Sequence, residues 1–161
     1  MKKYELTEET TNIFGKTLHR IRATRDFSIV HAGDLGGFIE DERNLNHGEN
    51  AWVGGNAWVY GNALVSGEAR VYGEARVEGN ARVKGTRDIY WISCIGSRDG
   101  TTTFFRNADN GISVACGCFY GTIDEFAAAV TKTHGDNEHA RAYRHAIEIA
   151  KLRIKLEAAE S

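Results

Sequence analysis

The middle of the chain repeats one short pattern of small, apolar and turn-forming residues. From Asn50 the sequence runs NAWVGG, NAWVYG, NALVSG, EARVYG, EARVEG and NARVKG, so that six hexads follow one another without a gap. Alanine is the second residue, valine the fourth and glycine the sixth residue of every hexad. Side chains alternate between the two faces of a strand, so alanine and valine point the same way. Each hexad therefore predicts a short strand with its apolar side chains inside, followed by a turn at glycine.

Three strands and three turns close a coil of three hexads, which determines the stacking of the outward side chains. We expect Arg70 to lie over Trp52, Arg76 over Trp58, and Arg82 over Leu64. In one interpretation the arginines solvate the surface and cover the aromatic rings. In the other they form an anion-binding or subunit-contacting ring. The outward apolar side chains form a large surface, which is typical of an interface. The predicted oligomer interface consists of Trp52, Trp58, Tyr60, Leu64, Arg70, Tyr72, Arg76 and Arg82.

The spacing of a valine and an alanine four residues later resembles the hexapeptide repeat of left-handed β-helices. Together with the segment that leads into it from Arg20, the repeat resembles bacterial and phage proteins of this type, including an uncharacterised phage-borne subgroup. The resemblance covers about residues 16–86 and implies a left-handed coil and a homo-oligomer, for which we expect a trimer. Many members of the family are acetyltransferases that use a histidine as general base. This repeat contains no histidine, and His47 lies just before it.

The segments around the repeat predict different elements. Residues 1–30 are strand-rich and are expected to cap the β-helix, which we assign to residues 31–86. Past that point the hexads stop, and three strands with Asp-Gly and Asn-Gly turns follow. A capping box of Thr122 and Glu125 begins a helix, and helical spacing of apolar residues predicts a second one. The predicted fold is mainly β, with a short left-handed parallel β-helix followed by a small α+β domain, residues 87–161, that contains a β-meander and two C-terminal helices.

Candidate binding chemistry lies in the first hairpin of that domain. Its turn and the strand after it are rich in glycine, hydroxyl groups and arginines, whose guanidinium forks suit phosphate. A polar turn beside an edge strand is the plainer interpretation. The candidate ligand-binding residues are Ser97, Arg98, Thr101, Thr102, Thr103 and Arg106. Cys116 and Cys118 do not have the spacing of a structural zinc site, so we expect buried thiols and no metal.

Composition limits the function further. The net charge of −2 argues against a dedicated nucleic-acid binder. No apolar run approaches the roughly 18 residues of a membrane span, and the N-terminus lacks a signal-peptide core. We therefore expect a cytoplasmic protein, in the host cytoplasm if it is phage-encoded. The prediction is a non-enzymatic, cofactor-free binding protein that sequesters a small anionic nucleotide-like ligand, a host immune signal, as an anti-defence factor. The alternatives are an inhibitor that binds a host protein directly and a hexapeptide-repeat acyltransferase.

Overall fold

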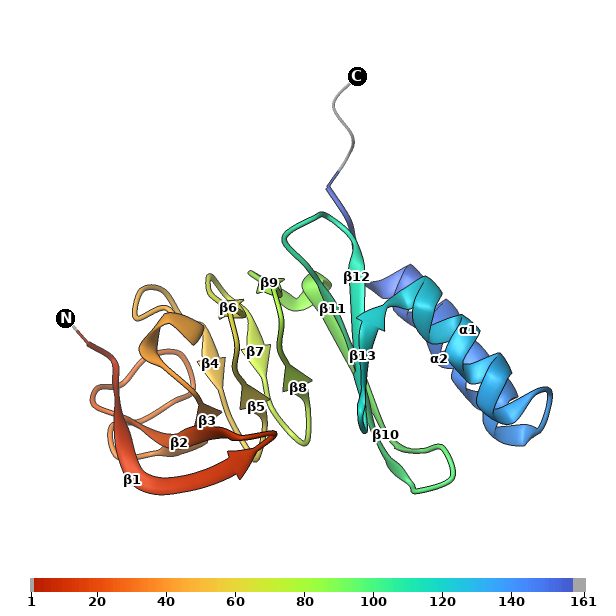
Figure 1. Cartoon of the computed structure of the whole chain (residues 1–161). Coiled ribbons are helices and arrows are strands. Elements are labelled where there is room, and N and C mark those ends of the chain that lie inside the picture. Colours follow the sequence, from red (N-terminus) through yellow and green to blue (C-terminus); the bar gives the residue numbers. More distant parts are fainter. Residues whose placement is uncertain (1, 158–161) are drawn as a thin grey trace. The chain divides into compact units, whose positions relative to one another are not determined.

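The computed structural model describes residues 2–157 and divides the chain into two compact units, Met1–Thr86 and Arg87–Ser161 (Figure 1). Unit 1 contains the strands β1 (Tyr4–Ile13), β2 (Lys16–Ala23), β3 (Leu35–Ile39), β4 (Trp52–Val53), β5 (Trp58–Val59), β6 (Leu64–Val65), β7 (Arg70–Val71), β8 (Arg76–Val77) and β9 (Arg82–Val83). Unit 2 contains β10 (Ile89–Ile95), β11 (Gly100–Arg106), β12 (Ile112–Cys116), β13 (Phe119–Thr122), α1 (Ile123–His134) and α2 (Glu138–Arg153). Single 3-10 turns span Glu42–Asn44 and Thr86–Asp88.

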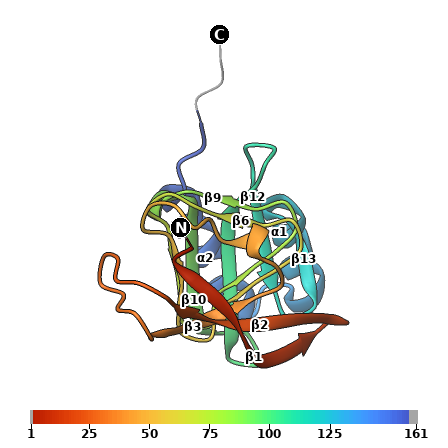
Figure 2. The same ribbon diagram turned by 90° about the vertical axis from the view of Figure 1, so that its left-hand side faces the viewer.

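Unit 1 contains one mixed sheet and two small parallel pairs. The hairpin of β1 and β2, which run side by side in Figures 1 and 2, pairs through β2 with β3, and all of this pairing is antiparallel. β3 continues in parallel to β5 and β8, which completes a five-stranded sheet. β4 pairs with β7, and β6 with β9. The predicted stacking is confirmed, because Trp52 pairs with Arg70, Trp58 with Arg76 and Leu64 with Arg82.

The predicted β-helix is nevertheless wrong, although the expectation of a mainly β chain with two C-terminal helices is confirmed. The sheets are mainly antiparallel or mixed, and they are not those of a left-handed parallel β-helix. The parallel strands of the repeat are two residues long, whereas β1 and β2 have 10 and 8 residues. The reason lies in the glycine column, where residues such as Gly61 and Gly73 have positive φ angles of 69° and 68°. Extended backbone therefore ends after each valine, and the long strands come from segments outside the repeat.

The interior of the repeat agrees with the predicted alternation. All the alanines and valines of the six hexads are at most 1% exposed. The start of β1 and the residue before it are joined to this interior by two side chains. Lys3 Nζ donates to the carbonyls of Gly48 and Ala51 at 3.1 and 2.5 Å, and the Tyr4 hydroxyl donates to the carbonyl of Leu45 at 2.6 Å. These two side chains thus donate hydrogen bonds to backbone carbonyl groups of the segment before β4.

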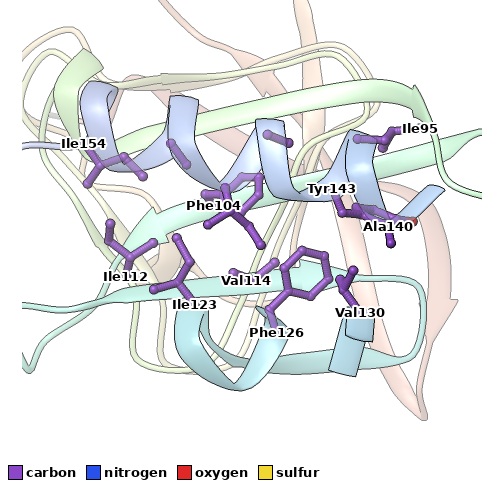
Figure 3. Packing of buried hydrophobic residues seen from close by; sticks show 13 residues of the cluster. Ile95, Phe104, Ile112, Val114, Ile123, Phe126, Val130, Ala140, Tyr143 and Ile154 are labelled. Atoms are coloured by element: carbon purple, nitrogen blue, oxygen red, sulfur yellow. The ribbon is translucent and has the colours of Figure 1, made fainter. Parts of the chain in front are cut away.

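Unit 2 is an antiparallel sheet in the order β10-β11-β12-β13, with α1 and α2 packed on one face. Figure 3 shows Phe104 and Val114 of the sheet against Phe126 of α1, all of them at most 3% exposed. The predicted capping box of α1 is confirmed, since Thr122 and Glu125 exchange both hydrogen bonds. The described sheet has four strands where three were predicted, because a turn at Gly117, with φ of 57°, separates β12 from β13.

Candidate functional site

A cavity of about 310 Å³ lies in unit 1 beside the pair β4–β7. The two strands and the residues after them supply its base, the loop between β2 and β3 supplies one side, and the residue at the corner before β4 lies at one end. The lining residues are Ser28, Ile29, Val30, Asn50, Trp52, Gly54, Arg70, Val71 and Tyr72. Parallel pairing of β4 and β7 brings two of these segments together, and a contact between the loop and β7 adds the third.

Gly54 leaves the space that the cavity occupies. It holds an outward position that is filled in the other hexads by Tyr60, Ser66, Tyr72, Glu78 and Lys84. A Cβ atom at Gly54 would meet only ordinary contacts, at 3.5 Å from Trp52 Cδ1 and 3.6 Å from Tyr72 Cβ. Its φ angle is not among the positive ones, so the backbone does not require glycine here. The missing side chain is therefore not needed to form a turn. It leaves room between two aromatic residues.

Arg70 supplies positive charge to the cavity. Its Nη2 donates to the Ser28 hydroxyl at 2.7 Å, which joins the loop to β7. Within residues 2–157, no carboxylate forms an ion pair with Arg70. Arg76, at the equivalent position on β8, is different, because its Nε lies 2.8 Å from Glu78 Oε2. Arg70 is thus able to pair with an anion from outside, since a hydroxyl group does not neutralise it.

The aromatic side of the cavity is rigid where it meets the core and exposed at its rim. The Trp52 ring packs edge-on against Phe27, with centroids 5.3 Å apart, and against Tyr4 at 6.5 Å. Tyr72 and Ile29, in contrast, are 56% and 72% exposed. A ring that entered the cavity would contact a fixed indole below and two side chains at the opening. Gly54 opens this space, and the sequence shows it as the one glycine at the fifth position of the hexads. The hexad pattern alone, however, does not predict a cavity there.

The structure does not bring the candidate ligand-binding residues of unit 2 to one surface. Ser97 and Arg98 lie exposed in the turn between β10 and β11, and Thr101 is half-buried beside Ser93. Thr102 and Thr103 have no exposed surface and point to opposite faces of β11, where the Thr102 hydroxyl donates to Cys116 Sγ at 3.2 Å. Arg106 is also buried, and its guanidinium lies 3.2 Å from both Asp88 and Glu157. Arg106 is the residue of this set best suited to bind phosphate, and it is therefore already paired with two carboxylates.

The glycine at the start of that turn has an internal role. A Cβ atom at Gly96, whose φ is +84°, would lie 2.0 Å from the Tyr143 hydroxyl oxygen. The glycine therefore accommodates this hydroxyl, which lies 3.7 Å from Cys116 Sγ. Burial and the neighbouring thiol raise the pKa of Tyr143 to about 12. The glycine in the turn of the candidate site thus makes room for a side chain of α2.

Most residues of the predicted oligomer interface are partly buried against the chain itself. Trp58 and Tyr60 pack with Ile13 and Leu18 of the β1–β2 hairpin. Tyr60 is 3% exposed and donates to Glu78 Oε2 at 2.6 Å, and burial together with this hydrogen bond raises its pKa.

The other members of that set lie on three different strand pairs. Trp52 packs with the loop before β3, and Arg76 lies over the ring of Phe14 at 5.7 Å. Arg82 Nη1 donates to the carbonyl of Asn62 at 2.9 Å, and Leu64 is half-buried on β6. Tyr72 and Arg70, the exposed members, belong to the cavity described above. These residues therefore do not form one continuous surface, and the trimer stays a prediction.

His47, the histidine that an acyltransferase would use, is held at both ring nitrogens. Its Nδ1 accepts from the backbone N–H of Lys3 at 3.2 Å, and Nε2 lies 3.0 Å from Glu42 Oε1. The ring also stacks on Tyr4, with centroids 4.0 Å apart. The hydrogen bonds of Glu42 with Lys2 and His47 lower the pKa of this carboxyl. A general base needs a nitrogen that faces the substrate, and here both nitrogens face other parts of unit 1.

Comparison with known proteins gives no family. The sequence matches no protein-family model and no curated protein. The resemblance to hexapeptide-repeat β-helix proteins of bacteria and phages is therefore corrected, because it has neither a family match nor the sheet arrangement that it implies. Over the described chain, no helix is long and apolar enough to cross a membrane, and no group of three or more His, Cys, Asp or Glu side chains is placed to hold a metal ion.

Proposed function

We propose that the protein is a non-enzymatic binding protein for a small anionic ligand with a planar ring, of about the size of one nucleotide. The observation that carries this proposal is the cavity at Gly54, which combines an open space of about 310 Å³ with aromatic residues and one arginine. Small-molecule sites are concave, mostly apolar and furnished with a few polar groups, and their volumes begin at roughly 300 Å³. The volume of the cavity therefore favours a ligand with one base or ring over a ligand with two.

The lining supplies the interactions that such a ligand needs. A planar ring beside Trp52 and Tyr72 gains stacking energy, which is roughly 1–3 kcal/mol for a base on an aromatic side chain. The guanidinium of Arg70 has donors in a fixed planar fork that suits the oxygens of a phosphate or carboxylate. Asn50 adds an amide at the end of the cavity. These groups favour a mononucleotide-like ligand over an uncharged aromatic one.

The same lining supports binding without turnover. Among the described residues that line the cavity there is no carboxylate, imidazole or thiol that would act as a base or nucleophile. The hydroxyl of Ser28 accepts a hydrogen bond from Arg70, and none of the residues that line the described cavity is a base. Sequestration of a signalling nucleotide in the cytoplasm is the role that such binding would serve.

The test is incubation of the purified protein with a pool of cyclic and linear mononucleotides, followed by mass spectrometry of the free pool. We expect one class of nucleotide to be depleted and recovered intact after heat denaturation of the protein. Consumption without recovery would mean an enzyme and would overturn the proposal. Absence of any depletion would also overturn it and would favour a protein partner at the exposed rim of Ile29 and Tyr72.

Three variants locate the site. Gly54→Tyr places in the cavity the residue that Tyr60 shows to be compatible with the repeat, and it should abolish binding. Ser66→Tyr makes the same change at the equivalent position of β6, away from the cavity, and should leave binding unchanged. Arg70→Gln should weaken binding by roughly 10- to 100-fold, because hydrogen bonds to charged groups contribute about 1.5–3 kcal/mol. Equal binding by the two tyrosine variants would place the ligand elsewhere.

A further inference from the structure

Ser28 occupies a position of a tight turn that favours a different residue. Phe27 and Val30 exchange two backbone hydrogen bonds, at 2.9 and 2.8 Å, so that Ser28 and Ile29 are the two residues of a hairpin turn. Ser28 has a positive φ angle of 51°. Two-residue hairpin turns with positive φ at the first position favour glycine or asparagine there. A serine in this conformation costs energy, and such residues gather where a side chain takes part in a binding site.

The surroundings of the turn keep the Ser28 hydroxyl in one place. Phe27 and Val30, on the two sides of the turn, are buried and pack with the Trp52 ring. The carboxylate of Asp26 accepts at 2.8 Å from the backbone N–H of Ala32, which closes the loop outside the turn. The hydroxyl is therefore an acceptor on a fixed frame.

The hydrogen bond to Ser28 holds Arg70 and leaves most of its donors unused. A guanidinium has five N–H donors. Within residues 2–157, the one hydrogen bond of the Arg70 side chain runs from Nη2 to the Ser28 hydroxyl at 2.7 Å. The hydroxyl is uncharged, whereas Arg76 at the equivalent position is paired with the carboxylate of Glu78. Arg70 is thus held by the chain while it keeps its positive charge and four N–H donors.

We propose, on the basis of the function proposed above, that Ser28 is a positioning residue, whose hydroxyl holds the Arg70 guanidinium in place for the anionic group of the ligand. An arginine that is already held has less rotamer freedom to lose when the ligand binds. Removal of the hydroxyl should therefore weaken binding of an anionic ligand about 3- to 10-fold. An uncharged ligand with the same ring should be unaffected, because it does not pair with Arg70.

The test combines two measurements on the full chain and its variants Ser28→Ala, Ser28→Gly and Ser28→Asn. Isothermal titration calorimetry measures the affinity for the 5′-monophosphates and 3′,5′-cyclic monophosphates of adenosine, guanosine, cytidine and uridine, each compared with its nucleoside. ¹⁵N relaxation of the Arg70 Nε–H group measures the order of this side chain without ligand, and Arg70→Gln identifies its signal.

The three variants separate the hydroxyl from the backbone conformation. Ser28→Ala should lower the order of Arg70 and weaken nucleotide binding about 3- to 10-fold, with nucleoside binding unchanged. Ser28→Gly should do the same although glycine relieves the positive φ. Ser28→Asn should retain more of the order and of the affinity than Ser28→Ala, because asparagine tolerates this conformation and provides an acceptor oxygen.

Other results overturn the inference or the proposed function separately. Unchanged order of Arg70 in Ser28→Ala overturns the inference. Tighter nucleotide binding by Ser28→Ala also overturns it, because Ser28 would then compete with the ligand for Arg70. Full binding by Ser28→Gly would assign the effect to the backbone and would overturn it as well. If Arg70 loses order in Ser28→Ala but no nucleotide binds the unmodified protein, the proposed function fails and the positioning of Arg70 by Ser28 stands.

Discussion

Lys3 gives unit 1 a stability that depends on pH. Its side chain has no exposed surface, and its Nζ donates to three backbone carbonyls, those of Gly48, Glu49 and Ala51. Burial, followed by the positive charge of Arg25, lowers the pKa of Lys3 to about 8 from the ordinary value of 10.5. Between these two values the unfolded chain binds more protons than the folded one. The free energy of unfolding must therefore rise as the pH increases from about 8 towards 10.5.

The size of this change follows from the two pKa values. One pKa unit corresponds to about 1.4 kcal/mol, so the free energy of unfolding should increase by about 2 kcal/mol between pH 7 and pH 9.5. The measurement should stop there because of Tyr4 and Tyr60. Burial raises the pKa of both hydroxyls, and a raised tyrosine pKa removes stability as the pH passes about 10.

The assay is urea unfolding followed by tryptophan fluorescence, because Trp52 and Trp58 lie in unit 1 and report on its packing. Lys3→Met keeps the length of the side chain and removes the titrating group. The difference between the unmodified protein and Lys3→Met should increase by about 2 kcal/mol in favour of the unmodified protein from pH 7 to pH 9.5. A difference that stays constant, or that moves in the opposite direction, would refute the assignment of a buried, destabilised ammonium group to Lys3.

Three further predictions concern the stability of the fold. Val71→Ala removes two carbons from a fully buried side chain and should lower the free energy of unfolding by about 2 kcal/mol in urea titrations. Thr122→Ala breaks the capping box of α1 and should cost about 1 kcal/mol, which thermal unfolding followed by circular dichroism would detect. Gly96→Ala should destabilise unit 2 by about 1–3 kcal/mol, because its Cβ would collide with the Tyr143 hydroxyl. Gly100→Ala is the matched control, since nothing lies within 4 Å of its Cβ and its φ is not positive; equal effects of the two substitutions would contradict this reason.

Local features were predictable from the sequence where short-range chemistry determines them. The pairing of Trp52 with Arg70 follows from the length of three hexads, and the start of α1 follows from the capping box of Thr122. The fold class was not predictable in this way, since it depends on the long strands β1 and β2, which have no repeat. The candidate site also depended on distant contacts, because the bond between Ser28 and Arg70 joins residues 42 positions apart. No local pattern contains that information.

The repeat shows which kind of side chain is usual at each position of a hexad, so a residue that departs from it can be recognised. A glycine in an ordinary loop has many explanations, but Gly54 occupies a column in which five other hexads have a side chain, on a backbone that tolerates one. Arg70 differs from Arg76, which has a carboxylate partner, and Arg82 at the third equivalent position donates to the carbonyl of Asn62. Gly54 and Arg70 line the same cavity. Structural requirements explain the columns that do not vary. Because these requirements are the same in every hexad, they do not explain a side chain that is missing at one place. The proposed binding of a ligand would give this missing side chain a purpose.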